Sequence, residues 1–405
     1  MNKIGIMGGT FNPIHNSHIL LGIEAKNLFN LDKVLFMPTQ NPPYKEIADN
    51  ISNEDRCEMV RRAVAGTDGL EFCDYEFHRE GKTYTSDTLI SLCNENPDTR
   101  YYFIIGADSI GYFDKWHLPE VILRHSAIIC APRADMNRDV TFSEIERIRS
   151  LYTVSDEDGT VFRPEIYYMA SPCMDISSTT IRAYITCGLS IKGLVPDAVN
   201  EYICSEGLYK SEKIAYIKEN LKKLLSEKRY THVLSVADFA LKLALIHDCD
   251  PIKTYIAGLL HDCAKYLSDE EILSEMKRYG LKPDKAELAL PNNLLHSKIG
   301  AYYAKEKYGI EDEEIISSIS YHTTGRPGMG LLEKIIFLSD TLEYGRKMVY
   351  EPSLDIIRSI ATTDLNKAVF YVMNNNVPYV IENFKDNVCQ ASIEAFEFYK
   401  KNYGD

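Results

Sequence analysis

The sequence lacks any apolar run of the roughly 18 residues that a helix needs to cross a bilayer. Its first residues, MNKIGIMGGTF, hold an apolar stretch that is too short for a signal peptide and leads directly into a glycine turn. The ten cysteines form no CxxC pair and have no regular spacing, which is typical of reduced thiols in a cytosolic protein. We therefore expect a cytoplasmic protein without membrane spans or a disulfide framework.

An excess of basic charge is also missing. The 59 acidic residues outnumber the 45 lysines and arginines, which leaves a net charge of -14. This balance argues against broad binding to nucleic acid or to anionic membranes, but it still allows a local basic site for a nucleotide. No internal repeat or low-complexity segment is present, and 405 residues suggest two or three domains. The oligomeric state stays open, a homo-oligomer included.

Up to about residue 208, short apolar runs alternate with helical patterns. The runs that predict strands are 3–7, 34–37, 101–105, 127–131 and 166–169. The patterns that predict helices are 18–28, 54–65 and 178–184. Such alternation favours crossover units and a parallel sheet, so residues 1–208 are expected to form a Rossmann-like α/β domain. Ligands of such sheets bind at the carboxyl ends of the strands.

After about residue 211 the pattern becomes helical throughout. Predicted helices cover 212–227, 231–247, 252–266, 269–279, 297–308, 312–320, 331–342 and 383–400. We therefore expect a second, all-α domain over 212–405, joined to the first by a short segment without a proline- or serine-rich linker.

The segment GGTFNPIHNSH after the first strand carries the first candidate site. Gly8 and Gly9 let the backbone turn sharply and approach a ligand closely. A helix is predicted to begin near His15, and its backbone N–H groups and dipole favour a phosphate there. His15 and His18 are three residues apart and share one helix face, so both imidazoles are able to donate to that phosphate.

This segment resembles the HxGH signature of the nucleotidyltransferase superfamily. Further blocks make the first half similar to the nicotinate-nucleotide adenylyltransferase family: NPPYK at 41–45, TYTSDTL at 83–89, IIGADS at 104–109, KWH at 115–117 and ISSTTIR at 176–182. The resemblance implies transfer of the adenylyl group of ATP to nicotinate mononucleotide. The reaction is an in-line attack on the α-phosphorus that needs no enzyme nucleophile, with Mg²⁺ bound to ATP.

The resemblance also implies roles for individual residues. The groups expected around the ATP phosphates are His15, His18, Lys45, Ser178 and Arg182. Thr85 and Trp116 would hold the nicotinate ring, Asp108 a ribose or the adenosine, and Arg133 a substrate phosphate. Other nucleotide contacts are expected from the matched blocks, namely Gly8, Gly9, Thr10, Phe11, Gly106, Ser177 and Thr179.

Two positions depart from the family pattern. Ser17 stands where the family usually has glycine, and Tyr44 where it commonly has histidine. A side chain at Ser17 would crowd the nucleotide, whereas neither change removes a charge from the phosphate site. The alternative is another nucleotidyltransferase of the same superfamily, such as the pantetheine phosphate enzyme, against which the TYTSDTL block and Trp116 argue.

A different group of residues marks the second half. His261 and Asp262 follow the apolar run YIAGLL at 255–260, which requires a buried helix. Polar side chains at the end of such a helix are costly unless they bind something, and a metal satisfies both. Imidazole together with carboxylate suits iron, manganese or zinc better than calcium.

These residues resemble the HD phosphohydrolase superfamily, in which H…HD…D holds a metal. By that pattern the first metal is bound by His232, His261, Asp262 and Asp340, and the second by Asp262, His296 and His322. Local phrases such as RYTH at 229–232 and LLHDCAK at 259–265 look like the YqeK-type family. That likeness implies symmetrical hydrolysis of diadenosine tetraphosphate to two ADP by two divalent metals, iron or manganese, with Asp262 as a catalytic residue.

Lys265, one turn after His261, is expected either to contact a substrate phosphate or to be solvated. Other HD activities stay open, among them hydrolysis of guanosine tetraphosphate or of mononucleotides. A degenerate regulatory module and a binding protein that senses dinucleotides are the non-enzymatic alternatives. The presence of all six candidate metal ligands argues against degeneracy.

Overall fold

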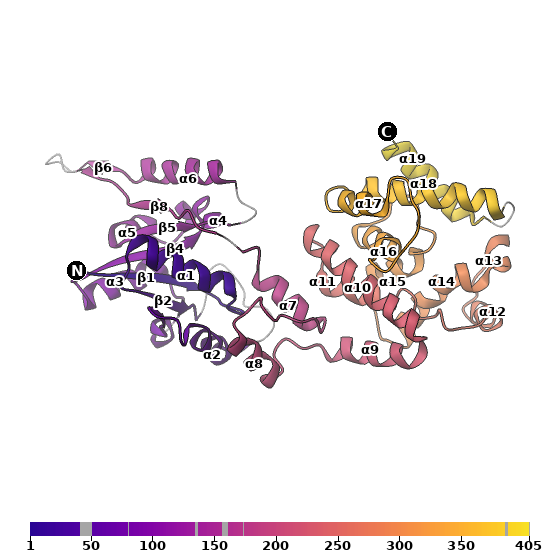
Figure 1. Cartoon of the computed structure of the whole chain (residues 1–405), viewed down its shortest axis with the longest axis horizontal. Helices are drawn as coiled ribbons and strands as arrows, with labels where there is room; N and C mark the ends of the chain where they lie inside the picture. Colours follow the sequence, from indigo (N-terminus) through magenta and orange to yellow (C-terminus); the bar gives the residue numbers. More distant parts are fainter. Residues whose placement is uncertain are drawn as a thin grey trace. The chain divides into compact units, whose positions relative to one another are not determined.

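The computed structural model describes residues 1–40, 51–79, 81–133, 137–155, 161–172, 174–384 and 388–404. The chain divides into two compact units, Met1–Lys210 and Ser211–Asp405, drawn from indigo to magenta and from rose to yellow in Figure 1.

The first unit is built on a six-stranded parallel sheet. Its strands are β1 (Asn2–Gly9), β2 (Lys33–Pro38), β3 (Leu70–Phe72), β4 (Thr99–Gly106), β5 (Ser126–Ala131) and β8 (Ile166–Tyr168), in the spatial order β3-β2-β1-β4-β5-β8. The order reverses between β1 and β4, because the chain runs outward from β1 on one side and from β4 on the other. This is the doubly wound Rossmann arrangement, which binds ligands at that reversal.

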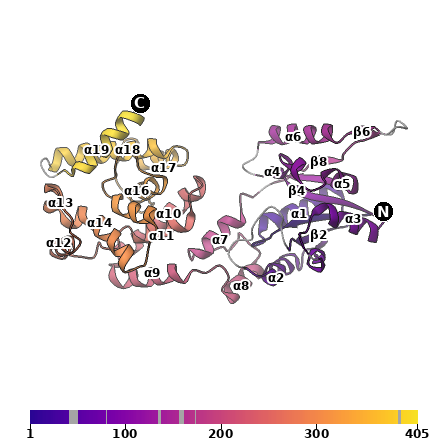
Figure 2. The same cartoon turned by 180° about the vertical axis from the view of Figure 1, so that it is seen from behind.

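Helices cover both faces of the sheet, as the opposite views of Figures 1 and 2 show. One core packs α1 (Asn16–Phe29), α2 (Asn53–Val64), α7 (Ser178–Thr186) and α8 (Asp197–Glu206) on one face. The other core packs α3 (Thr85–Glu95), α4 (Ala107–Ile110), α5 (Pro119–His125) and α6 (Arg138–Leu151) on the opposite face. Neighbouring strand residues alternate between the two cores, as Ile128 and Ile129 do, so the strands are apolar on both sides.

Smaller elements complete the first unit: the 3₁₀ turns η2 (Tyr75–His78) and η3 (Phe113–Lys115), and the hairpin of β6 (Val154–Ser155) with β7 (Val161–Phe162). The described residues of the second unit form helices and no strand. They are α9 (Glu212–Leu224), α10 (Glu227–Ile246), α11 (Pro251–Leu260), α12 (Asp269–Arg278), α13 (Lys285–Ala289), α14 (Pro291–Glu306), α15 (Glu313–Tyr321), α16 (Leu331–Leu342), α17 (Leu354–Ala361), α18 (Leu365–Phe384) and α19 (Gln390–Tyr403).

The predicted fold class, a Rossmann-like sheet followed by an all-α unit, is confirmed. Several predicted helices differ in extent: the one predicted over 212–227 ends at Leu224, and the one predicted over 297–308 begins at Pro291. The helix predicted over 252–266 ends at Leu260, because the following backbone makes tighter turns in which Cys263 donates to Leu260 and Lys265 to Asp262. The range predicted as one helix over 383–400 falls on two, since α18 ends at Phe384 and α19 begins at Gln390. Among the described residues, no helix is both long and apolar enough to cross a membrane.

Two candidate active sites

A cavity of about 540 Å³ opens at the reversal of the sheet, where β1 and β4 end. Eleven of the residues predicted for the nucleotide site line it: Gly8, Gly9, Thr10, His15, His18, Thr85, Gly106, Asp108, Trp116, Arg133 and Ser177. Phe11, Ser178, Thr179 and Arg182 do not line it, and Lys45 and Tyr44 lie outside the described residues. The cavity is within the size range of small-molecule sites.

His15 and His18 form a stacked pair at the start of α1. Their ring centroids are 3.7 Å apart, and His15 is the residue that caps the helix. The backbone N–H of His15 donates to Nδ1 of His18 at 3.3 Å. Because Nδ1 accepts, the neutral His18 ring carries its proton on Nε2 and has that N–H to offer.

Both imidazoles are held in the neutral form. Burial, followed by the positive charge of Arg133, lowers the pKa of His15 to about 4. Burial, then His15 and Arg133, hold the pKa of His18 well below its usual value. Nδ1 of His15 is buried and has no hydrogen-bond partner among the described residues. The pair therefore presents polar, uncharged nitrogens at the cavity.

The start of α7 is tied to the loop that follows β1. Ser177 caps α7 by accepting from the N–H of Thr180, and Ser178 Oγ donates to the carbonyl of Pro13 at 2.9 Å. Arg182 Nη1 donates to the carbonyl of Asn12 at 2.8 Å. These contacts show two residues of the predicted phosphate group, Ser178 and Arg182, holding the backbone of the glycine-rich loop.

Asp108 and Arg133 form a two-pronged ion pair at the mouth of the cavity. Nε of Arg133 donates to Oδ1 of Asp108, and Nη2 of Arg133 donates to Oδ2, each at 3.1 Å. A Cβ at Gly106 would lie 2.3 Å from Oδ1 of Asp108, so only glycine allows this carboxylate its place. The pair joins the ends of β4 and β5 beside the ligand cavity.

Aromatic and small polar side chains also line the cavity. Trp116 is half-buried against Phe113, with ring centroids 5.2 Å apart, and lines the cavity. Thr85 is the first residue of α3, and Ser17 also lines the cavity with only 8% of its surface exposed. Ser17, which stands where the family usually has glycine, thus lies at the cavity, and its crowding of a nucleotide stays a prediction.

Sequence reasoning missed two buried charged residues of this unit. Arg56 is fully buried, and its Nη1 donates to the carbonyl of Thr10 at 2.7 Å, which fixes the loop after β1. Glu76 lines the cavity, and burial raises its pKa despite hydrogen bonds from neighbouring threonines. Only Arg56 could have been found from the sequence, because it is the one arginine on the apolar face of its helix.

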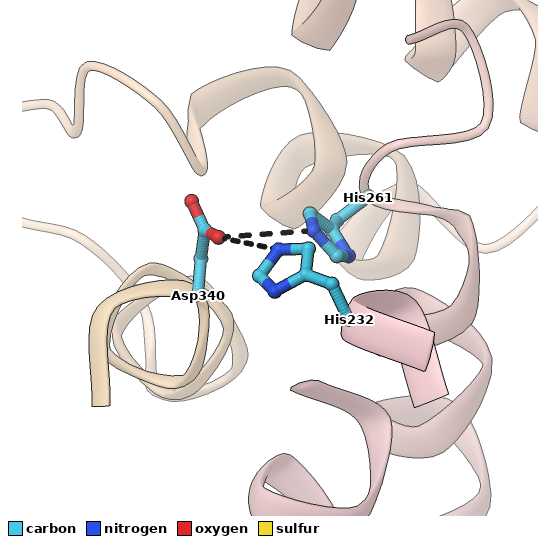
Figure 3. Close-up of side chains that lie close together, drawn as sticks. All are labelled: His232, His261 and Asp340. Atoms are coloured by element: carbon cyan, nitrogen blue, oxygen red, sulfur yellow. Dashed lines mark hydrogen bonds and ion pairs between the residues drawn. The ribbon is translucent and has the colours of Figure 1, made fainter. Parts of the chain in front are cut away.

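In the second unit, Asp340 joins the first group of predicted metal ligands. Its Oδ1 lies 3.0 Å from Nε2 of His232 and 3.9 Å from Nε2 of His261. Figure 3 shows the three side chains meeting from α10, the end of α11, and α16. His232 and Asp340 are 108 residues apart in the sequence, so only the tertiary fold brings them together.

Asp262 joins this group to the second pair of histidines. Its Oδ2 lies 3.5 Å from Nε2 of His261, and its Oδ1 lies 3.1 Å from Nε2 of His296 and 3.8 Å from Nε2 of His322. The carboxylate therefore faces both halves of the cluster, and all six predicted ligands lie in one place. Asp262 would therefore be a ligand of each of two metal ions.

The tautomers fit metal binding. Nδ1 of His261 donates to the carbonyl of Gly258 at 2.6 Å, and Nδ1 of His322 donates to that of Ile319 at 2.8 Å. These bonds orient each Nε2 toward the cluster. Nε2 of His261 is fully buried and has no hydrogen-bond partner among the described residues. A buried imidazole nitrogen that faces two carboxylates at ion-pair distance fits a bound cation.

The charges around the cluster also fit a bound cation. Burial opposes charge on Asp262, but His261 and His296 outweigh it and hold the pKa of this carboxyl well below its usual range. Burial likewise opposes charge on His261, but Asp262 and Asp340 outweigh it and raise the pKa of that imidazole. Burial, then His261 and His296, lower the pKa of His322 to about 3. The carboxylates thus attract one positive charge to a place that a metal ion would fill.

Sequence reasoning missed three residues that touch this cluster. Glu343 is buried and accepts from Nδ1 of His232 at 3.2 Å, which orients that imidazole. Arg229 and Arg346 contact the carboxylates of Asp262 and Asp340. Glu343 lies one helical turn after Asp340, and this spacing could have predicted that it lies near the cluster.

Lys265 is half-buried and is held by protein groups. Its Nζ donates to the carbonyl of Asn292 at 3.0 Å and lies 3.3 Å from Nδ1 of His296. Burial lowers the pKa of its ammonium. The expectation of a solvated lysine is therefore wrong, and its contact with a phosphate stays a prediction.

Comparison with known proteins places both units. Residues 6–184 match the cytidylyltransferase-like family model. A protein described as a probable nicotinate-nucleotide adenylyltransferase from Lachnoclostridium phytofermentans is 38% identical over 209 residues, which are 52% of this chain and 100% of the relative. The first half of the chain belongs to the nicotinate-nucleotide adenylyltransferase family. Another member, from Geobacter metallireducens, is 36% identical over 215 residues, with 52% of this chain and 100% of that one covered.

The adenylyltransferase region is followed by an HD domain. Residues 229–345 match the HD domain model, and this range contains all six metal-ligand candidates. A crystal structure from Clostridium acetobutylicum, described as a predicted HD superfamily hydrolase involved in NAD metabolism, is 38% identical. The match covers 46% of this chain and 96% of that one, with a TM-score of 0.43.

Proposed function

We propose that the first unit transfers the adenylyl group of ATP to nicotinate mononucleotide, with deamido-NAD and pyrophosphate as products. The observation that carries the proposal is the cavity at the reversal of the sheet, lined by the His15–His18 pair, Arg133 and Trp116. The family of the relatives supports the same reaction.

The chemistry needs positioning and charge compensation. A phosphate oxygen of nicotinate mononucleotide attacks the α-phosphorus of ATP, and the bond to pyrophosphate breaks. His18 Nε2–H, the start of α1 and Arg133 are proposed to stabilise the charge that develops on the phosphates, which their position at the cavity supports. Lys45, Ser178 and Arg182 remain candidates for the same role. Mg²⁺ would enter bound to ATP.

Trp116 and Thr85 are proposed to select the pyridine ring. Both line the cavity, and Trp116 offers an aromatic face for stacking. Asp108 is proposed to bind a ribose or the adenosine.

A substrate panel tests this proposal. The full-length protein would be given ATP with nicotinate mononucleotide, nicotinamide mononucleotide or phosphopantetheine, and pyrophosphate release would be measured. We expect the fastest turnover with nicotinate mononucleotide. Preference for phosphopantetheine would replace this proposal with the alternative transferase.

We propose further that the HD domain hydrolyses diadenosine tetraphosphate to two ADP. The observation that carries this second proposal is the convergence of six ligand-type side chains on the carboxylates of Asp262 and Asp340. His232, His261, Asp262 and Asp340 would hold one divalent metal, and Asp262, His296 and His322 another. Two metals of this kind, iron or manganese, supply an acidified water and a clamp for the attacked phosphate.

The protein residues orient this site. Glu343 and the carbonyls of Gly258 and Ile319 fix three imidazoles, so the ligand nitrogens face inward. Competing substrates are guanosine tetraphosphate and mononucleotides, and the competing role is a regulatory module that senses nucleotides.

Elemental analysis of the purified protein, paired with product analysis, tests the second proposal. We expect up to two iron or manganese ions per chain and ADP as the sole nucleotide product from diadenosine tetraphosphate. Products of AMP and ATP would contradict symmetrical cleavage. Metal-loaded protein without turnover on any of these substrates would favour a sensing module.

A further inference from the structure

The last residues of the first unit contact the loop that follows β1. Tyr209 lies one position before the final residue of that unit, Lys210, and its hydroxyl donates to Oδ1 of Asn12 at 2.6 Å. The two residues are 197 positions apart in the sequence, and both are buried. Tyr209 also lies one residue beyond the range 1–208 expected for the first domain. The adenylyltransferase region therefore takes a loop contact from the segment that leads to the HD domain.

The backbone holds Tyr209 in an uncommon conformation. Its φ of 61° lies in the left-handed region, which residues other than glycine rarely adopt. The hydroxyl of Thr186 donates to the carbonyl of Tyr209 at 2.9 Å and holds this turn. The ring of Tyr209 packs in the core that includes α1, α2, α7 and α8. Backbone conformations of this kind persist only where surrounding contacts hold them, and they are frequent at functional sites.

The loop between β1 and α1 is anchored at several points. Three side chains hold it by its backbone carbonyls, namely those of Arg56, Ser178 and Arg182. Tyr209 differs from these three, because it holds a side chain of the loop, that of Asn12. Asn12 stands between Thr10 and His15, which both line the cavity. A residue that fixes Asn12 therefore fixes the backbone between two residues of the nucleotide site.

We propose that Tyr209 is a positioning residue of the adenylyltransferase site, which places the loop after β1 through Asn12 and thereby places the groups that face the ATP phosphates. The inference rests on the proposed transfer reaction. In-line attack depends on the alignment of the phosphates, and a misplacement of about 1 Å can lower a rate by about a hundredfold. Tyr209 and Asn12 do not line the cavity, so they act through the loop.

Tyr209→Phe in the full chain tests the inference. The change removes the hydroxyl and keeps the ring in the core. We expect kcat for adenylyl transfer to fall about tenfold. KM for nicotinate mononucleotide should change little, because Thr85 and Trp116, which are proposed to hold its pyridine ring, lie on other elements. In the Asn12→Ala background, Tyr209→Phe should lower kcat no further, since the hydroxyl has lost its acceptor.

Tyr202→Phe is the matched control. Tyr202 lies on α8, and its hydroxyl donates to Oδ1 of Asp55 at 2.7 Å. This variant therefore loses a comparable hydrogen bond, one that joins α8 to α2 instead of holding the loop, and it should keep the wild-type kcat. Urea unfolding followed by the fluorescence of Trp116 would compare the stability of the first unit in the two variants.

Hydrogen exchange supplies a measure that does not need turnover. The amides of residues 8–18 belong to the loop and the start of α1, so their protection by Mg²⁺-ATP reports on this site and not on the HD domain. These amides should exchange faster in Tyr209→Phe than in the wild type, and Mg²⁺-ATP should protect them less. Tyr202→Phe should exchange like the wild type.

The outcomes separate this inference from the proposed function. Wild-type kcat in Tyr209→Phe would overturn the inference and leave the transferase standing, even if the loop exchanged faster, because the bond would then serve the fold alone. An equal fall of kcat in Tyr202→Phe would show a general loss of stability and overturn it as well. Absence of adenylyl transfer in the wild type, with protection by Mg²⁺-ATP that depends on Tyr209, would overturn the proposed reaction and leave Tyr209 as the positioning residue of a nucleotide site.

Discussion

The two sites of this chain collect their chemical groups in different ways. The adenylyltransferase cavity takes its groups from the ends of neighbouring strands and the starts of helices, and backbone N–H groups contribute with the side chains. The HD cluster instead takes six side chains from five helices or helix ends. The first site therefore depends on a loop conformation, and the second on a balance of buried charges.

This difference predicts how each site responds to damage. Removing one side chain from the cavity leaves the helix N-termini and Arg133 in place. Removing one charge from the cluster leaves the remaining buried charges without compensation. Loss of one side chain should therefore damage the HD cluster more than the cavity.

The largest effect is expected for Asp262→Asn. The carboxylate faces all four histidines of the cluster, so its loss should remove metal and lower phosphoanhydride hydrolysis by about a thousandfold or more. The amide has the same shape, which protects the fold. Metal content and ADP production would be measured beside adenylyl transfer, which should be unchanged. A parallel fall in both activities would show that the sites are not independent.

A smaller effect is expected for His18→Ala. The change removes one donor from the proposed phosphate site, so adenylyl transfer should fall about a hundredfold to a thousandfold. Hydrolysis in the HD domain should persist. His78→Ala is the matched control, since His78 is an exposed histidine of the same unit paired with Asp74. Turnover of His18→Ala equal to that of the control would remove His18 from the mechanism.

The smallest effect concerns stability and pH. His15 has a folded pKa of about 4 against 6.5 in the unfolded chain, so the unfolded state binds more protons between these values. The free energy of unfolding should be greatest above pH 6.5 and should fall as the pH drops toward 4. His15 contributes at most about 3 kcal/mol of that loss.

His15→Asn should reduce this dependence and leave the part due to His18. Trp116 is the only tryptophan of the chain, so its fluorescence during urea unfolding reports on the first unit alone. If the free energy of unfolding changed equally with pH in the wild type and in His15→Asn, the neutral, buried state of His15 would be contradicted.

Prediction from sequence succeeded where a signal is local. The strand β1, the glycine turn and the start of α1 follow from contiguous residues, and their order fixes where the cavity opens. The strand β3 and the helix α3 were missed, because three residues are too few for a periodic pattern and a threonine-rich start resembles a loop. The early end of α11 was missed because apolar periodicity does not distinguish an α-helix from tighter turns.

The sequence alone determined the two-part architecture, the family resemblance and the identity of every metal-ligand candidate. These depend on residue types and on spacing along the chain. The tertiary structure decided that all six ligands meet around Asp262, that Arg182 holds a loop carbonyl, and that Arg229 and Arg346 border the HD site. Most of these contacts join residues tens to more than a hundred positions apart, and only packing of the helices determines which of them meet.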